Sequence, residues 1–78
     1  MMIGTVIGRV VATQKVKSLV GYTLLRIKSE DGSVFVAADS LGAGIGATVI
    51  VTRGGAVQIA LDRPAPIDAM VVGIVDQD

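Results

Sequence analysis

Three glycines stand at alternate positions in residues 39–46, between two runs of residues that are typical of β-strands. A glycine inside a regular element costs about 0.5–1 kcal/mol relative to alanine, so three of them indicate a segment in which the backbone must turn or approach another group closely. A phosphate site would require a helix after the glycines and a different glycine spacing. The segment therefore predicts a tight loop between two strands and not a nucleotide site.

The chain is small, and it is apolar for its size. Its 78 residues predict one domain, residues 1–78. A chain of this length buries only roughly 60–65% of the surface that it exposes when unfolded. Hydrophobic residues make up 51% of the chain and charged residues 18%, while cysteine and histidine are absent, so neither a disulfide nor a structural zinc ion adds stability. We therefore expect identical copies to associate and cover the apolar surplus.

A membrane is a poor alternative cover for this apolar surface. No stretch approaches the roughly 18 uninterrupted apolar residues that a membrane-spanning helix requires. Gly8 and Arg9 interrupt the most apolar part of the N-terminal region. A secretory signal peptide would need a basic segment before a continuous apolar one, and we expect none here. The sequence predicts no contact with a membrane.

Charge and residue types argue against nucleic-acid binding and catalysis. Seven basic residues balance seven acidic ones, and Tyr22 and Phe35 are the only aromatic residues, which is too few for a base-stacking platform. Without histidine or cysteine, most arrangements for nucleophilic catalysis are missing. We expect no enzyme activity and no cofactor. A small nucleic-acid-binding barrel of the OB type stays as the alternative function, because its outline also consists of short strands.

Five segments have the composition of β-strands, and together they predict an all-β fold. In the second segment, Leu25 and Ile27 face one side while Arg26 and Lys28 face the other. An Asp-Gly pair within residues 30–33 predicts a hairpin turn into the third segment. The predicted strands cover residues 3–13, 22–29, 34–38, 48–52 and 67–76.

The segment between the fourth and fifth predicted strands is irregular. Gly54 and Gly55 end the fourth strand, and residues 56–61 favour a short helix over a short extra strand. Residues 63–66 contain two prolines and are expected to be extended, because each proline restricts both itself and the residue before it.

The last predicted strand is apolar at every position from 70 to 75. A strand with one solvated face alternates apolar and polar residues, whereas continuous apolarity indicates that both faces are covered. One face would pack into the barrel core, and we expect the other to pack on a neighbouring copy. The alternative is that residues 56–61 of the same chain cover the second face.

Three segments of the chain, in register, resemble the vertex proteins of bacterial microcompartment shells, the EutN/CcmL type. They are GTVIG with VVATQK at residues 4–8 and 10–15, AADSLGAGIG at 37–46, and PIDAMVVGIVD at 66–76. The resemblance implies a small five-stranded antiparallel barrel, similar to an OB-fold, that forms a cyclic pentamer. It also implies a place in the bacterial cytoplasm at the fivefold vertices of a protein shell, a carboxysome or a catabolic compartment, beside hexameric shell proteins.

By the same resemblance, the glycine-containing segment lies near the fivefold axis, where five copies of one loop crowd together. The residues expected at the axis are Ser40, Leu41, Gly42, Ala43, Gly44, Ile45 and Gly46. The candidates for the subunit interface are Met70, Val72, Ile74, Asp76 and Arg9. Two segments depart from the family pattern. The turn at residues 30–33 replaces a longer insertion, and GGAVQ at 54–58 replaces a Gly-Ser-Ala-Ala-Arg-like segment, which leaves the short helix without the family's arginine.

Several charged residues have two interpretations. Asp39 and Asp68 at strand ends are expected to bond nearby backbone N–H groups rather than to join Asp76 in a metal or acid–base set. Lys15 and Lys17 are expected to be solvated, with docking of hexamers at the rim of the pentamer as the alternative. Met70 is expected to fill a gap in the core or in the interface.

Overall fold

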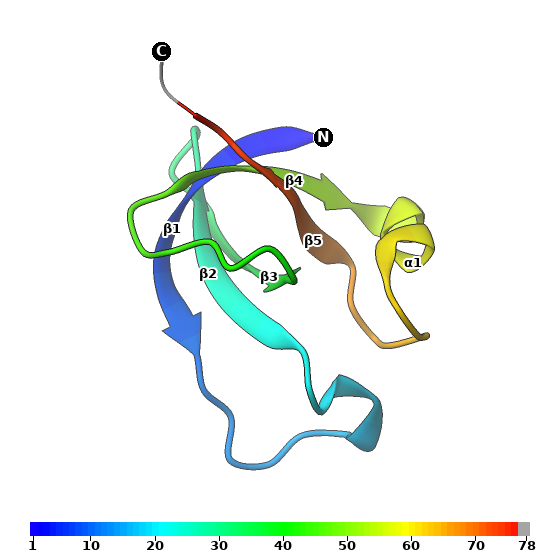
Figure 1. Ribbon diagram of the computed structural model, residues 1–78. Helices are drawn as coiled ribbons and strands as arrows, with labels where there is room; N and C mark the ends of the chain where they lie inside the picture. Colours follow the sequence, from blue (N-terminus) through cyan, green and yellow to red (C-terminus); the bar gives the residue numbers. More distant parts are fainter. Residues whose placement is uncertain (77–78) are drawn as a thin grey trace.

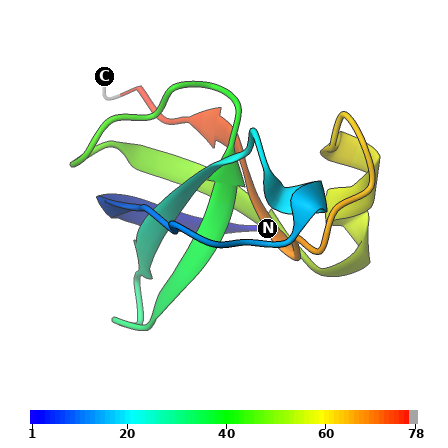
Figure 2. The same cartoon turned by 90° about the horizontal axis from the view of Figure 1, so that it is seen from below.

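The computed structural model describes residues 1–76, and its five strands form a closed barrel in the order β1-β2-β3-β5-β4 (Figures 1 and 2). A 3₁₀ turn, η1, precedes β2, and a second one, η2, leads into the single helix α1 between β4 and β5. None of the described helices is long and apolar enough to cross a membrane. The strands are β1 (Met2–Val10), β2 (Thr23–Ser29), β3 (Val34–Asp39), β4 (Thr48–Arg53) and β5 (Ala69–Ile74), and the helical segments are η1 (Lys17–Leu19), η2 (Gly54–Ala56) and α1 (Val57–Ala60).

Four of the five strand pairings are antiparallel, as predicted, and the fifth is parallel. The parallel seam joins β3 to β5 through a single pair, Ala38 and Met70. A ring of five strands cannot alternate direction all the way round, because five is an odd number. The predicted antiparallel barrel is therefore confirmed at four of the five pairings, and the β3–β5 seam is the exception. The five-stranded, all-β, OB-like outline with one short helix is confirmed.

The main core fills the inside of the barrel. In β2, Leu25 and Ile27 are buried while Arg26 and Lys28 are exposed, so the predicted alternation is confirmed. The large fully buried side chains are Val6, Leu25, Ile27, Val49, Val51 and Val71, with Val57 outside the barrel. Fully burying a side chain of this size contributes roughly 1.5–3 kcal/mol, so this cluster supplies most of the driving force for folding.

A second, smaller core lies outside the barrel wall, between β5 and the helical segment. It consists of Ala38, Val57, Ile67 and Met70. Figure 1 shows α1 lying beside the start of β5, where the chain crosses over from β4. The short helix predicted for residues 56–61 is confirmed, and it covers the outer side of β5 at Met70.

Element ends differ from the predicted ones by a few residues. The first strand ends at Val10, not at residue 13, because its partner β2 begins at Thr23 and the pairing stops at Val10 and Leu24. The last strand begins at Ala69, since residues 61–68 are still part of the crossover from α1. Gly54 begins η2 directly after Arg53, so the predicted end of the fourth strand is confirmed.

Candidate assembly surfaces

The glycine loop, residues 40–46, connects β3 to β4 and is fixed at its start by Asp39. The carboxylate of this residue is nearly buried and accepts hydrogen bonds from three successive backbone N–H groups. The donors are Leu41 at 3.0 Å, Gly42 at 3.0 Å and Ala43 at 2.9 Å. The prediction that Asp39 is a turn-forming residue is confirmed, and the described residues contain no group of three potential acidic, histidine or cysteine metal ligands.

The other end of the glycine loop is fixed to β1. The N–H of Gly46 donates to the carbonyl of Val6 at 2.8 Å, and the N–H of Val6 donates to the carbonyl of Ala47 at 3.0 Å. Ala43 and Ala47 pack against the main core. The start of the loop is therefore held by a side-chain carboxylate and its end by backbone bonds, and small side chains at 43 and 47 pack on the core.

The three glycines of the loop have different reasons to be glycine. Gly42 and Gly46 have φ values of 84° and 90°, a left-handed conformation that L side chains rarely adopt. Gly44 has no positive φ, and a Cβ built on it would meet nothing within 4 Å. Within one copy, Gly44 thus has no steric or conformational need to be glycine.

Apolar side chains project from the glycine loop beside a groove. Leu41 is 51% exposed and Ile45 is 73% exposed. The groove has a volume of about 480 Å³ and is bordered by the loop on one side and by β1 and β2 on the other. Arg9 lines this groove, so one interface candidate lies together with the predicted axial loop.

The candidates on and after β5 are placed in two different environments. Met70 is only 6% exposed and packs in the second core, so its expected role as a core residue is confirmed, and its role in the subunit interface stays a prediction. Val72 and Ile74 are 40% and 43% exposed, and Asp76 is exposed beyond the end of the strand. The start of β5 therefore uses its apolar residues within one copy, while its end leaves them uncovered.

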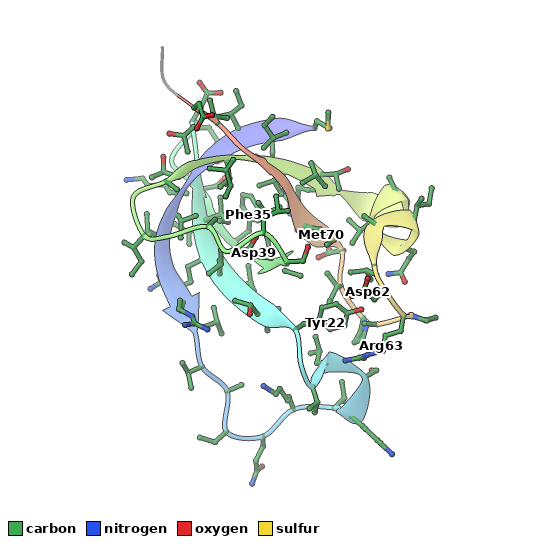
Figure 3. The ribbon with its side chains drawn as sticks, viewed as in Figure 1. Tyr22, Phe35, Asp39, Asp62, Arg63 and Met70 are labelled. Carbon is green, nitrogen blue, oxygen red and sulfur yellow. The ribbon has the colours of Figure 1, made fainter. Side chains whose placement is uncertain are left out.

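Sequence reasoning missed a set of contacts, here called the Arg63 clamp, that joins two distant loops. The guanidinium of Arg63 lies 4.7 Å from the ring centre of Tyr22 and donates to the carbonyls of Ser18, at 2.6 Å, and Val20. The hydroxyl of Tyr22 donates to the carbonyl of Arg63 at 2.9 Å. Figure 3 shows the two side chains together below α1. Ser18 and Tyr22 lie 45 and 41 residues before Arg63, so no local motif could have indicated the clamp.

Gln58 holds α1 to the segment that follows it. Its Nε2 donates to the carbonyls of Ala65 and Ile67, each at 3.0 Å. This glutamine stands where the family pattern has arginine, and its contact closes the second core at Ile67. In this chain, Gln58 therefore holds the short helix in place where the family pattern has an arginine.

The alternative function, nucleic-acid binding, gains nothing from the two aromatic residues. Arg63 lies over one face of Tyr22, and Arg53 lies 4.6 Å from the ring centre of Phe35. Phe35 also packs against the main core. Lys15 and Lys17 are exposed, as expected for solvated side chains.

Comparisons with known proteins give one family. The family model described as ethanolamine utilisation protein EutN/carboxysome matches residues 1–76. The carboxysome shell vertex protein CcmL of Gloeobacter violaceus is 43% identical, over 97% of this chain and 83% of that protein. The shell vertex protein PduN of Salmonella typhimurium is 40% identical, over 97% of this chain and 96% of that protein.

Solved structures agree with the sequence comparisons. The pentameric microcompartment shell protein GrpN from Rhodospirillum rubrum superposes with a TM-score of 0.87 at 43% identity, over 99% of this chain and 96% of that chain. The pentameric shell protein MSM0273 from the RMM microcompartment superposes with a TM-score of 0.90 at 32% identity, over 97% of this chain and 91% of that chain.

Proposed function

The chain belongs to the EutN/CcmL family of microcompartment shell vertex proteins, and we propose that five copies of it form a ring with the glycine loop at its centre. It is a structural shell protein that caps the fivefold vertices of a polyhedral compartment. In this role it has no catalytic site and no cofactor.

The observation that supports the ring is that different residues of one copy form two surfaces with exposed apolar side chains. One is the end of β5 with Val72 and Ile74, and the other is the glycine loop with the neighbouring groove. A cyclic head-to-tail assembly joins two different surfaces of identical subunits, whereas a twofold dimer would use a single surface twice. Gly44 supports the same arrangement. A single copy does not require glycine at this position, whereas a close approach between copies would require it.

The mechanism of the vertex is geometric. A layer of hexagons is flat and cannot close on itself, and a five-membered unit at each corner introduces the curvature that closes it. We infer that the rim of the ring docks against hexameric shell proteins, which are the partners expected in a layer of this kind. Tight corners would restrict the leakage of small molecules from the enclosed space.

The first experiment measures the mass of the purified protein by native mass spectrometry and sedimentation. The wild type is expected to have five times the subunit mass. Val72→Asp should abolish the ring and leave a folded single chain, because it places a carboxylate on the uncovered end of β5. Ile59→Asp is the matched control, since Ile59 is 89% exposed on α1 and lies outside both surfaces. A wild type that stays a single chain at micromolar concentration would overturn the proposal.

A second experiment addresses the position of the loop. A Cβ at position 44 would meet nothing within 4 Å in a single copy, so Gly44→Trp adds a bulky side chain at an open position, and it should prevent five loops from meeting at an axis. Normal pentamers of this variant would show that the glycine loop lies away from the axis. Mixing the ring with hexameric shell proteins and observing closed particles by electron microscopy tests the partner, with Val72→Asp as the negative control.

A further inference from the structure

The groove beside the glycine loop, here called the Arg9 groove, has both polar and apolar residues in its lining. The lining residues are Arg9, Thr23, Leu25, Asp39, Ser40 and residues 42–45. The carboxylate of Asp39, which also lines the groove, is nearly buried and accepts three backbone hydrogen bonds, and these bonds offset part of its negative charge. The groove therefore offers a guanidinium and two hydroxyl groups.

The chemistry of these groups favours a carboxylate as the occupant. Among residues 1–76, the side chains of Arg9, Thr23 and Ser40 make no hydrogen bond to one another or to other groups. A guanidinium presents paired N–H donors in a fork that matches the two oxygens of a carboxylate. Hydroxyl groups beside it supply further donors.

Asp76 is a carboxylate that the fold leaves exposed and that Arg9 of the same copy does not contact. The N–H of Val75 donates to the carbonyl of Thr48 at 2.9 Å, and Thr48 pairs with Thr5 in the first half of β1. Arg9 lies near the far end of β1, paired with Leu25. The segment that leads to Asp76 thus lies beside Thr48, whose partner Thr5 precedes Arg9 by four residues on β1.

Arg63, a second arginine that could pair with Asp76, is already used within the chain. The guanidinium of Arg63 donates to two backbone carbonyls and stacks on Tyr22 in the Arg63 clamp. An ion pair of Asp76 with Arg63 would break these contacts. Arg9 has no such competing contact, and its position in the lining of the groove distinguishes it from the other exposed basic residues.

We propose that Asp76 of one copy enters the Arg9 groove of the next copy and pairs with the guanidinium there. The inference rests on the proposed ring and specifies its contact. Val72 and Ile74 lie on the strand that leads to Asp76, so one segment supplies both the apolar and the charged part of the interface. Five such contacts, each between different surfaces, satisfy the requirement of a head-to-tail ring.

The test is a charge-reversal cycle measured by dilution and native mass spectrometry. Arg9→Glu and Asp76→Lys should each raise the concentration at which the ring dissociates by at least about tenfold, because each places like charges together at five interfaces. The double variant restores opposite charges and should recover most of the loss. Lys28→Glu is the matched control, since Lys28 is exposed on β2 outside the groove.

The outcomes separate this inference from the proposed ring. A wild-type ring that neither reversal weakens, or a double variant no better than the worse single variant, overturns the pairing and leaves the ring intact. A wild type that never forms a ring overturns the proposed function itself. If the single variants fail to fold by circular dichroism, Arg9→Gln and Asp76→Asn serve instead, and they should remove most of the salt dependence of wild-type dissociation. An unchanged salt dependence would contradict the pairing.

Discussion

The two halves of β5 have the same apolar composition and opposite environments. Met70, in the first half, is covered by α1 and the crossover that follows it, whereas Val72 and Ile74, in the second half, are exposed. The crossover between β4 and β5 consists of residues 54–68. A segment of this length packs against one end of β5 only. The contrast teaches that this chain covers one end of β5 by itself and leaves apolar side chains exposed at the other end.

The two turns that contain glycine show the same contrast. The hairpin turn after β2 is complete within one copy, because Asp31 accepts bonds from Ser29 and Ser33 and Gly32 has the required positive φ. The glycine loop is equally well fixed at both ends but leaves Gly44 without a local reason. Because a single copy does not require glycine at position 44, we expect a neighbouring copy to approach the loop there.

The largest effect tests the covered half of β5 against the open half. Met70→Ala should reduce the free energy of unfolding by about 2–5 kcal/mol, because it leaves a cavity in the second core. Val72→Ala should cost less than about 1 kcal/mol in the dissociated chain, since its side chain is already partly in water. Urea denaturation measures the free energy of unfolding of both variants, at a protein concentration low enough for the ring to dissociate. Equal losses for the two variants would break the comparison.

The next effect separates the glycines of the loop. Gly46→Ala should destabilise the single chain by about 1–2 kcal/mol, because alanine must adopt a φ near 90°. Gly44→Ala should leave the stability of the dissociated chain unchanged within about 0.5 kcal/mol. Thermal unfolding of the dissociated variants measures the difference. A loss at Gly44 as large as at Gly46 would show that a single copy does require glycine there.

Features encoded by neighbouring residues could be predicted from the sequence. The alternation of β2, the Asp-Gly hairpin, the end of β4 at Gly54 and the turn at Asp39 each depend on a few consecutive residues. The parallel seam needed no further data, because an odd number of strands in a closed ring requires one. The prediction of an antiparallel barrel named no strand order and therefore did not include this seam.

Features that join distant residues could not be predicted in this way. The Arg63 clamp connects residues 18–22 with Arg63, and no spacing rule selects one arginine among several for such a contact. The continuous apolar run at 70–75 predicted that both faces of β5 are covered. It did not indicate whether the outer face is covered by α1 of the same chain or by a second copy. In the proposed ring, α1 covers this run at Met70 and a second copy covers it at Val72 and Ile74.

A smaller effect tests how the covered half is held closed. Gln58→Ala removes two hydrogen bonds to backbone carbonyls at the edge of the second core and should cost about 1 kcal/mol. Gln58→Arg keeps donors at the position and should lose less than alanine does. Urea denaturation of the dissociated chain measures both variants, with Gln14→Ala as an exposed control. If alanine is as stable as glutamine, the crossover is held by its apolar contacts alone.

The smallest effect concerns the turn that is complete within one copy. The hydroxyl of Ser29, followed by the backbone N–H and the hydroxyl of Ser33, lowers the pKa of Asp31 from 3.8 to about 2. Because the folded pKa lies below the unfolded one, this turn stabilises the fold fully above pH 3.8 and loses its contribution as the pH falls through about 2. Ser29→Ala should raise the pKa of Asp31, which carboxyl NMR titration measures directly, whereas Ser18→Ala should leave it in place. An Asp31 midpoint that Ser29→Ala does not move would mean that the turn is not held by its own hydrogen bonds, and the contrast with the glycine loop would then disappear.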